Sequence, residues 1–295
     1  MEQVLITQKL SRNFGKLTAV DQLDLEIPKG SVYGILGPNG SGKTTTLGMI
    51  TGILRPSSGS FEWFGDPRKH FQKNLGAILE TPNFYDKLNA LENLKIIQHI
   101  KQNYTDDLGA LLKKVQLYDR RRSNFTSYSL GMKQRLAIAA ALIGQPEVII
   151  FDEPTNGLDP QGIADIRQLI GDIAATGITV IMASHMLAEV EKLCSHVAIL
   201  KSGQLLYSGT VEEISGKDRM VVLSADDNQK LSEFLSSQGL AEEIRPHESG
   251  LLVQLAEEIS LSELNRRLVL EGHAIHRLQE QSFNLESHFI KTISQ

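Results

Sequence analysis

The stretch Gly37-Pro38-Asn39-Gly40-Ser41-Gly42-Lys43-Thr44 decides the fold of this chain. It follows a strand-like run, Ser31–Leu36, and precedes a helix-like run, Thr45–Ile50. The spacing G-x-x-x-x-G-K-[ST] between a strand and a helix is typical of a loop that binds a nucleoside triphosphate. Its glycines let successive backbone N–H groups converge on the phosphates, and the helix adds its positive N-terminus. A glycine-rich turn without a ligand is the alternative, and the complete match with both flanks disfavours it.

Two side chains of this loop complete the expected phosphate site. Lys43 is expected to place a positive charge on the β- and γ-phosphates, and the Thr44 hydroxyl is expected to bind Mg²⁺. The residues expected to contact ATP in this segment are Gly37, Pro38, Asn39, Gly40, Ser41, Gly42, Lys43, Thr44 and Thr45.

The composition describes a soluble globular protein and excludes several other classes. The chain has 295 residues, of which 41% are hydrophobic and 22% charged, and its net charge of −5 gives no general attraction to nucleic acid. Its single cysteine, Cys194, cannot form an intrachain disulfide, which fits a reducing compartment. We expect no signal peptide at Met1–Ile6 and find no apolar run long enough to span a bilayer. If the protein acts at a membrane, another chain must supply the spanning helices.

Residues 1–215 show the pattern of an α/β domain. The continuous apolar runs Val148–Phe151 and Ile178–Ala183 predict buried strands of a parallel sheet, whereas the alternating run Val20–Ile27 predicts a half-exposed antiparallel strand. Apolar residues recur at helical spacing from Asn89 to Gln116, which predicts a helical subdomain inserted at about 80–128. A mostly parallel sheet with an antiparallel edge subdomain follows from this alternation.

The pattern resets after Ser215–Asp218. Residues 216–295 predict the order β-α-β-β-α-β, which is the split-βαβ arrangement of a small α+β domain. The run Phe283–Ile293 has the pattern of a closing helix. None of the nucleotide motifs lies in this domain, so we expect it to serve in dimer contact or regulation.

Three further residues follow core strands. Asp152 and Glu153 end the buried run Val148–Phe151, where one carboxylate can hold Mg²⁺ and the other can polarise the attacking water. An acidic turn is the alternative for this pair. His185 follows the run Ile178–Ala183 and can hydrogen-bond the γ-phosphate, although a single histidine is more often an ordinary surface residue.

Together these motifs resemble the nucleotide-binding subunit of an ATP-binding-cassette (ABC) transporter. The stretch that separates this family from other phosphate-loop NTPases is Ser129-Leu130-Gly131-Met132-Lys133-Gln134-Arg135, which resembles the ABC signature. The family consensus there has two glycines and a glutamine, and this chain keeps Ser129 and Gly131 but carries Leu130, Met132 and Lys133.

The resemblance implies several more roles. Asn156–Asp159 resembles the family's D-loop with Asp159 at its key position, Phe14 matches the aromatic residue that stacks on adenine, and His185 matches the switch histidine. Glu80 stands where the family normally has a glutamine, as in exporters that confer resistance to bacitracin and lantibiotics. Glu80 would then bind Mg²⁺ or contact the attacking water. An ordinary carboxylate at a helix entry is the alternative.

The family's activity is the hydrolysis of ATP with Mg²⁺ by a head-to-tail dimer. The resemblance implies that the phosphate loop of one copy faces Ser129–Gly131 of a second, identical copy, and that a separate transmembrane permease docks at 80–88. The chain would then be cytoplasmic, bound at the inner face of the membrane, and would drive export. A soluble ABC ATPase of translation or DNA maintenance is the alternative, but such proteins resemble fused cassettes or carry a long coiled-coil insertion. A phosphate-loop kinase or GTPase is disfavoured by the signature.

Overall fold

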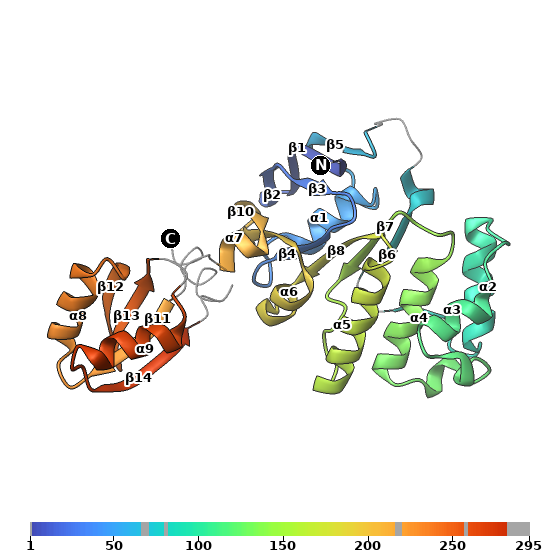
Figure 1. Cartoon of the computed structure of the whole chain (residues 1–295). Helices are drawn as coiled ribbons and strands as arrows, with labels where there is room; N and C mark the ends of the chain where they lie inside the picture. Colours follow the sequence, from blue (N-terminus) through green and yellow to red (C-terminus); the bar gives the residue numbers. More distant parts are fainter. Residues whose placement is uncertain (1, 66–70, 80–81, 216–219, 257–258, 282–295) are drawn as a thin grey trace. The chain divides into compact units, whose positions relative to one another are not determined.

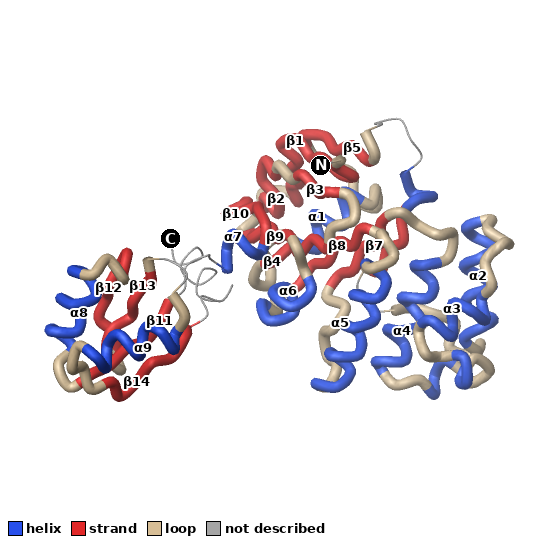
Figure 2. Tube along the Cα trace, viewed as in Figure 1, coloured by secondary structure: helices blue, strands red, loops and turns tan. Residues whose placement is uncertain are grey.

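The computed structural model describes residues 2–65, 71–79, 82–215, 220–256 and 259–281, and it contains two compact units, Met1–Val211 and Glu212–Gln295 (Figure 1). Each unit has its own hydrophobic core. Figure 2 shows the helices and strands of each unit.

The larger sheet of the first unit has the strand order β10-β9-β4-β8-β7-β6, and its neighbouring strands are parallel except for the pair β10–β9. The side chains of β7 and β8 are buried throughout, as the continuous apolar runs predict. Because parallel strands end at one edge, the residues that follow β4, β7 and β8 meet there. The strands are β4 (Val32–Leu36), β6 (Leu75–Ile78), β7 (Val148–Asp152), β8 (Thr179–Ser184), β9 (His196–Lys201) and β10 (Gln204–Thr210).

The smaller sheet of this unit is antiparallel and consists of β1 (Gln3–Phe14), β2 (Leu17–Leu23), β3 (Glu26–Pro28) and β5 (Ser58–Trp63). The prediction of one strand over Val20–Ile27 was wrong, because the chain is interrupted between β2 and β3. There the Thr7 hydroxyl donates to Leu23 O and accepts from Leu25 N, both at 2.8 Å. These two bonds bridge the interruption beside the backbone bond from Thr7 N to Leu25 O at 2.9 Å, and β1 keeps nearly the same register with β2 and β3 on either side of it.

Helices connect and cover these sheets. Helix α1 (Lys43–Ile50) shares one buried cluster with strands of both sheets. The expected helical insertion contains α2 (Ala90–Lys101) and α3 (Leu108–Lys114), and Glu80 at its entry lies outside the described residues. Within the described ranges no helix has the length and apolarity that crossing a bilayer requires. Further helices of this unit are α4 (Leu130–Leu142), α5 (Pro160–Ala174) and α6 (Leu187–Leu193), with short 3₁₀ turns η1 (Phe71–Asn74), η2 (Tyr118–Arg120) and η3 (Phe125–Ser127). Helix α7 (Val211–Ser215) begins at the last residue of the first unit, and its other residues belong to the second.

The second unit has the predicted β-α-β-β-α-β order. Its sheet has the strand order β12-β13-β11-β14, with all pairs antiparallel, and leucines of both helices share a core with β11 and β13. The predicted helix over Phe283–Ile293 lies outside the described residues. The elements are β11 (Met220–Ala225), α8 (Asn228–Ser237), β12 (Ala241–His247), β13 (Gly250–Leu255), α9 (Leu261–Leu270) and β14 (Ile275–Gln281).

Candidate functional site

The phosphate-loop sequence forms the turn between β4 and α1. Gly40 and Gly42 have φ angles of 81° and 102°, which favour glycine, and Gly42 is the N-cap of α1. A Cβ on Gly37 would lie 2.4 Å from Leu200 O, so that position is also restricted to glycine. Lys43 is only 6% exposed, and its amine donates to the backbone oxygens of Gly37 at 2.8 Å and Pro38 at 3.3 Å. The loop therefore curls around the Lys43 amine and holds it by backbone hydrogen bonds; this loop is called the cradle below.

Three of the predicted catalytic side chains lie in contact at this edge of the sheet. The Lys43 amine is 3.4 Å from Glu153 Oε1, and His185 Nδ1 is 2.8 Å from Glu153 Oε2. Glu153 has a φ of 49°, and its N–H donates to Ala183 O at 3.0 Å, which ties the residue to the end of β8. A carboxylate between an ammonium and an imidazole can accept a proton while both partners face an incoming anion.

Oxygen donors suited to Mg²⁺ lie beside this cluster. Asp152 is the last residue of β7 and is 6% exposed, and Thr44 is an exposed residue of the first turn of α1. Carboxylate and hydroxyl oxygens are hard ligands of the kind that Mg²⁺ accepts together with phosphate oxygens. The residues present therefore fit a magnesium–nucleotide complex.

A cavity of about 520 Å³ lies over the phosphate loop. Phe14 lines this cavity and is 45% exposed. The Arg12 guanidinium lies over the Phe14 ring, 4.6 Å from its centroid. Four lining residues were not predicted from the sequence: Leu17, Thr18 and Ala19 of β2, and Ser202 of the turn between β9 and β10. The sequence signal that could have predicted them is the pair of turns Gly15-Lys16 and Ser202-Gly203. These turns join β1 to β2 and β9 to β10, and both hairpins lie next to the phosphate loop. The full lining is Phe14, Leu17, Thr18, Ala19, Asn39, Gly40, Ser41, Gly42, Lys43, Thr44, Thr45, Glu153 and Ser202.

The signature and the D-loop form a second hollow of about 460 Å³, which shares no lining residue with the first. Ser129 caps α4 by accepting from Met132 N at 3.3 Å, and the helix therefore begins at Leu130. Asp159 caps α5 by accepting from Gly162 N at 2.9 Å. Gly131 and Asp159 thus lie together on this surface and do not line the phosphate-loop cavity of the same chain.

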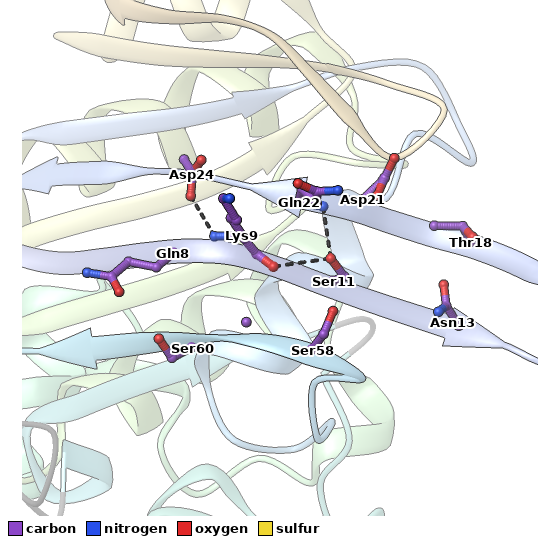
Figure 3. Close-up of a pocket in the computed structure, with 11 residues that line it drawn as sticks. Gln8, Lys9, Ser11, Asn13, Thr18, Asp21, Gln22, Asp24, Ser58 and Ser60 are labelled. Carbon is purple, nitrogen blue, oxygen red and sulfur yellow. Dashed lines mark hydrogen bonds between the residues drawn. The ribbon is translucent and has the colours of Figure 1, made fainter.

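A third hollow, of about 850 Å³, lies on the antiparallel sheet and is lined by polar side chains of β1, β2 and β5 (Figure 3). Its carboxylates belong to Asp21 and Asp24, and the latter accepts from Lys9 N. Except for Thr18, its lining residues are absent from the phosphate-loop cavity. Two carboxylates disfavour a polyphosphate, so the cavity over the phosphate loop is the better candidate for a nucleotide site.

Comparison with known proteins agrees with this geometry. Residues 20–156 match the ABC transporter family. The chain is 35% identical to the bacitracin transport ATP-binding protein BcrA of Bacillus licheniformis over 99% of this chain and 98% of that protein. It is 38% identical to the lantibiotic transport ATP-binding protein SrtF of Streptococcus pyogenes over 69% of this chain and 89% of that protein.

Solved structures support the same assignment. The ADP conformation of MJ1267, an ATP-binding cassette of an ABC transporter, superposes with a TM-score of 0.65 and 26% identity over 72% of this chain and 93% of that one. The fold therefore agrees with the predicted phosphate-loop NTPase class, and the signature-like stretch distinguishes the family as the sequence implied. This chain belongs to the ABC transporter family, as an ATP-binding subunit.

Proposed function

We propose that this chain hydrolyses ATP at the interface of a head-to-tail dimer and thereby drives export through a separate permease at the inner face of the cell membrane. The observation that carries the proposal is the contact of Lys43, Glu153 and His185 beside the phosphate loop. These groups supply a cation for the phosphates, a base for the water and a hydrogen-bonding group for the γ-phosphate.

Each residue has a separate role in the reaction. Lys43 releases its backbone acceptors in favour of the β- and γ-phosphates, and Glu153 orients and polarises the attacking water. His185 bonds the γ-phosphate while Glu153 holds its ring. Asp152 and Thr44 would hold Mg²⁺, which when bound neutralises charge on the phosphate oxygens. Phe14 offers the exposed ring on which adenine can stack.

The second hollow supports the dimer. Ser129 and Gly131 are displayed apart from the phosphate loop of their own chain, so their proposed ligand is the nucleotide of a second copy. The γ-phosphate then contacts both chains and stabilises the closed dimer, and its hydrolysis weakens the contact. The relatives' names suggest a peptide antibiotic such as bacitracin or a lantibiotic as the cargo.

An apolar groove in the helical region is the proposed permease contact. It has a volume of about 400 Å³ and includes Phe84, Ile97 and Ile100, of which Ile100 is 73% exposed. Lys101 lines the same groove, and its amine donates to Ile143 O at 2.7 Å. Burial lowers the pKa of Lys101, and the Asp106 carboxylate opposes that shift. An exposed apolar groove of this kind suits a short helix of a partner.

Purification of the chain from its native membranes tests this part of the proposal. A protein with several membrane-spanning helices should co-elute, and Ile100→Glu should reduce the co-eluting amount at least tenfold because a charge would enter the apolar contact. Ile53→Glu is the matched control, since Ile53 is 69% exposed and does not line the groove. Elution without any membrane partner would favour the alternative of a soluble ABC ATPase.

We also propose that the nucleotide-binding unit folds without the C-terminal unit, which would act in dimer contact or regulation. A chain ending before Lys217 should remain soluble, and ATP with Mg²⁺ should raise its melting temperature as in the full chain. The reason is that the residues of the nucleotide site and their core all lie before Val211. If the truncated chain is soluble but ATP does not raise its melting temperature, the proposal that the nucleotide-binding unit folds independently is refuted.

A further inference from the structure

The turn between β9 and β10 contacts two parts of the nucleotide cavity, the phosphate loop and strand β2, through one residue, Gly203. Its N–H donates to Ser41 O at 3.0 Å, and its carbonyl accepts from Asp21 N at 2.8 Å. Ser41 belongs to the phosphate loop, which follows a strand of the larger sheet. Asp21 lies in β2 of the smaller sheet, where Figure 3 shows its side chain. The neighbouring side chain, Gln204, donates to Asp21 Oδ2 at 3.4 Å.

A side chain has no room at this junction. Gly203 has a φ of 83°, and a Cβ there would lie 2.8 Å from Ala19 O. A Cβ on Gly42 would lie 2.6 Å from the same oxygen and 3.5 Å from Gly203 Cα. The phosphate loop, the start of β2 and the β9–β10 turn therefore meet backbone to backbone. Ser202 of the same turn lines the nucleotide cavity.

We propose that Gly203 is a positioning residue for ATP, because its two backbone hydrogen bonds set the distance between the base-binding surface and the phosphate loop. Phe14 and Leu17 stand on the smaller sheet, and the triphosphate cradle stands on the larger one, so a nucleotide must span both. The proposal rests on the nucleotide site proposed above. ATP would contact both the smaller sheet and the phosphate loop, whereas inorganic tripolyphosphate would contact only the phosphate loop. The proposal therefore implies that loss of Gly203 weakens the binding of ATP more than the binding of tripolyphosphate.

The test is titration calorimetry of the full chain with Mg²⁺ and either ATP or tripolyphosphate. Gly203→Ala should weaken ATP binding by roughly tenfold to a hundredfold, because strain and the contact with Ala19 displace β2 from the loop. Tripolyphosphate affinity should stay within about threefold. Gln204→Ala weakens the same link without backbone strain, so it should reduce ATP affinity by about twofold to fivefold and spare tripolyphosphate.

The matched control is Gly177→Ala. Gly177 also has a positive φ, of 91°, but none of the described residues has an atom within 4 Å of its Cβ position, and it precedes β8 at the end of that strand remote from Ser184. The control should lower the melting temperature as Gly203→Ala does and leave the affinity for ATP unchanged.

The outcomes separate the two proposals. A wild-type chain that fails to bind ATP would refute the nucleotide site itself. If the wild type binds ATP and Gly203→Ala binds it equally well, the positioning role is wrong. Equal losses of ATP and tripolyphosphate, or a loss of ATP affinity in Gly177→Ala, would overturn it as well.

Discussion

Lys43→Ala should weaken ATP binding by roughly tenfold to a hundredfold and reduce turnover by a further hundredfold or more. The ammonium is the buried cation within the cradle, held 2.8 Å from Gly37 O and 3.4 Å from Glu153. Alanine removes the charge that meets the β- and γ-phosphates, and the exposed loop amides alone must then bind the anion. Calorimetry with ATP and a steady-state phosphate-release assay measure the two effects.

Lys192→Ala is the control for this substitution, because Lys192 is an exposed lysine on α6. Its loss changes the net charge by the same amount and should alter neither affinity nor turnover. Near-normal ATPase activity in Lys43→Ala would exclude the phosphate loop as the catalytic site.

Glu153→Gln should preserve ATP binding and reduce hydrolysis by roughly a hundredfold to ten-thousandfold. An amide keeps the size of the side chain and can still bond His185, but it cannot accept a proton from water. It also ends the ion pair with Lys43, which leaves that amine free to meet the phosphates. With ATP uncleaved, the dimer should accumulate, and size-exclusion chromatography with ATP and Mg²⁺ should show it.

Glu212→Gln serves as the control, since Glu212 is an exposed carboxylate in α7. It should hydrolyse ATP at the wild-type rate and form no lasting dimer. If Glu153→Gln hydrolyses ATP normally and remains a monomer, the base must be another group, and Glu80 would be the next candidate to test.

The sequence predicted the fold where its local signals and its burial pattern agreed. The glycine spacing around Lys43 predicted the phosphate loop, and the apolar runs of β7 and β8 predicted two buried strands beside it. These predictions succeeded because few other structures are compatible with such patterns. The break between β2 and β3 was missed because it depends on the Thr7 hydroxyl, 16 residues away from Leu23. Periodicity carries no information on a bond of that kind.

The same distinction applies to the site. Loop, strand-end and signature residues could be named because each belongs to a nucleotide-binding motif. Thr18, Ala19, Ser202 and Gly203 belong to no such motif: the turns beside them are visible in the sequence, but their place at the site depends on tertiary packing. The contact of Glu153 with both Lys43 and His185 likewise depends on how three strand ends align. The sequence supplied candidate groups but could not say which of them touch.

The most direct test of a shared active site combines Glu153→Gln with Gly131→Glu. Among the described residues a Cβ on Gly131 meets only Leu158, at 3.8 Å, and an acidic residue in the first turn of α4 is locally favourable, so the protomer should fold. Analytical ultracentrifugation with ATP and Mg²⁺ should find Glu153→Gln as a dimer. The double variant should bind ATP with unchanged affinity yet remain monomeric, because the new carboxylate would face the partner's γ-phosphate. An ATP-dependent dimer of the double variant would contradict the head-to-tail arrangement.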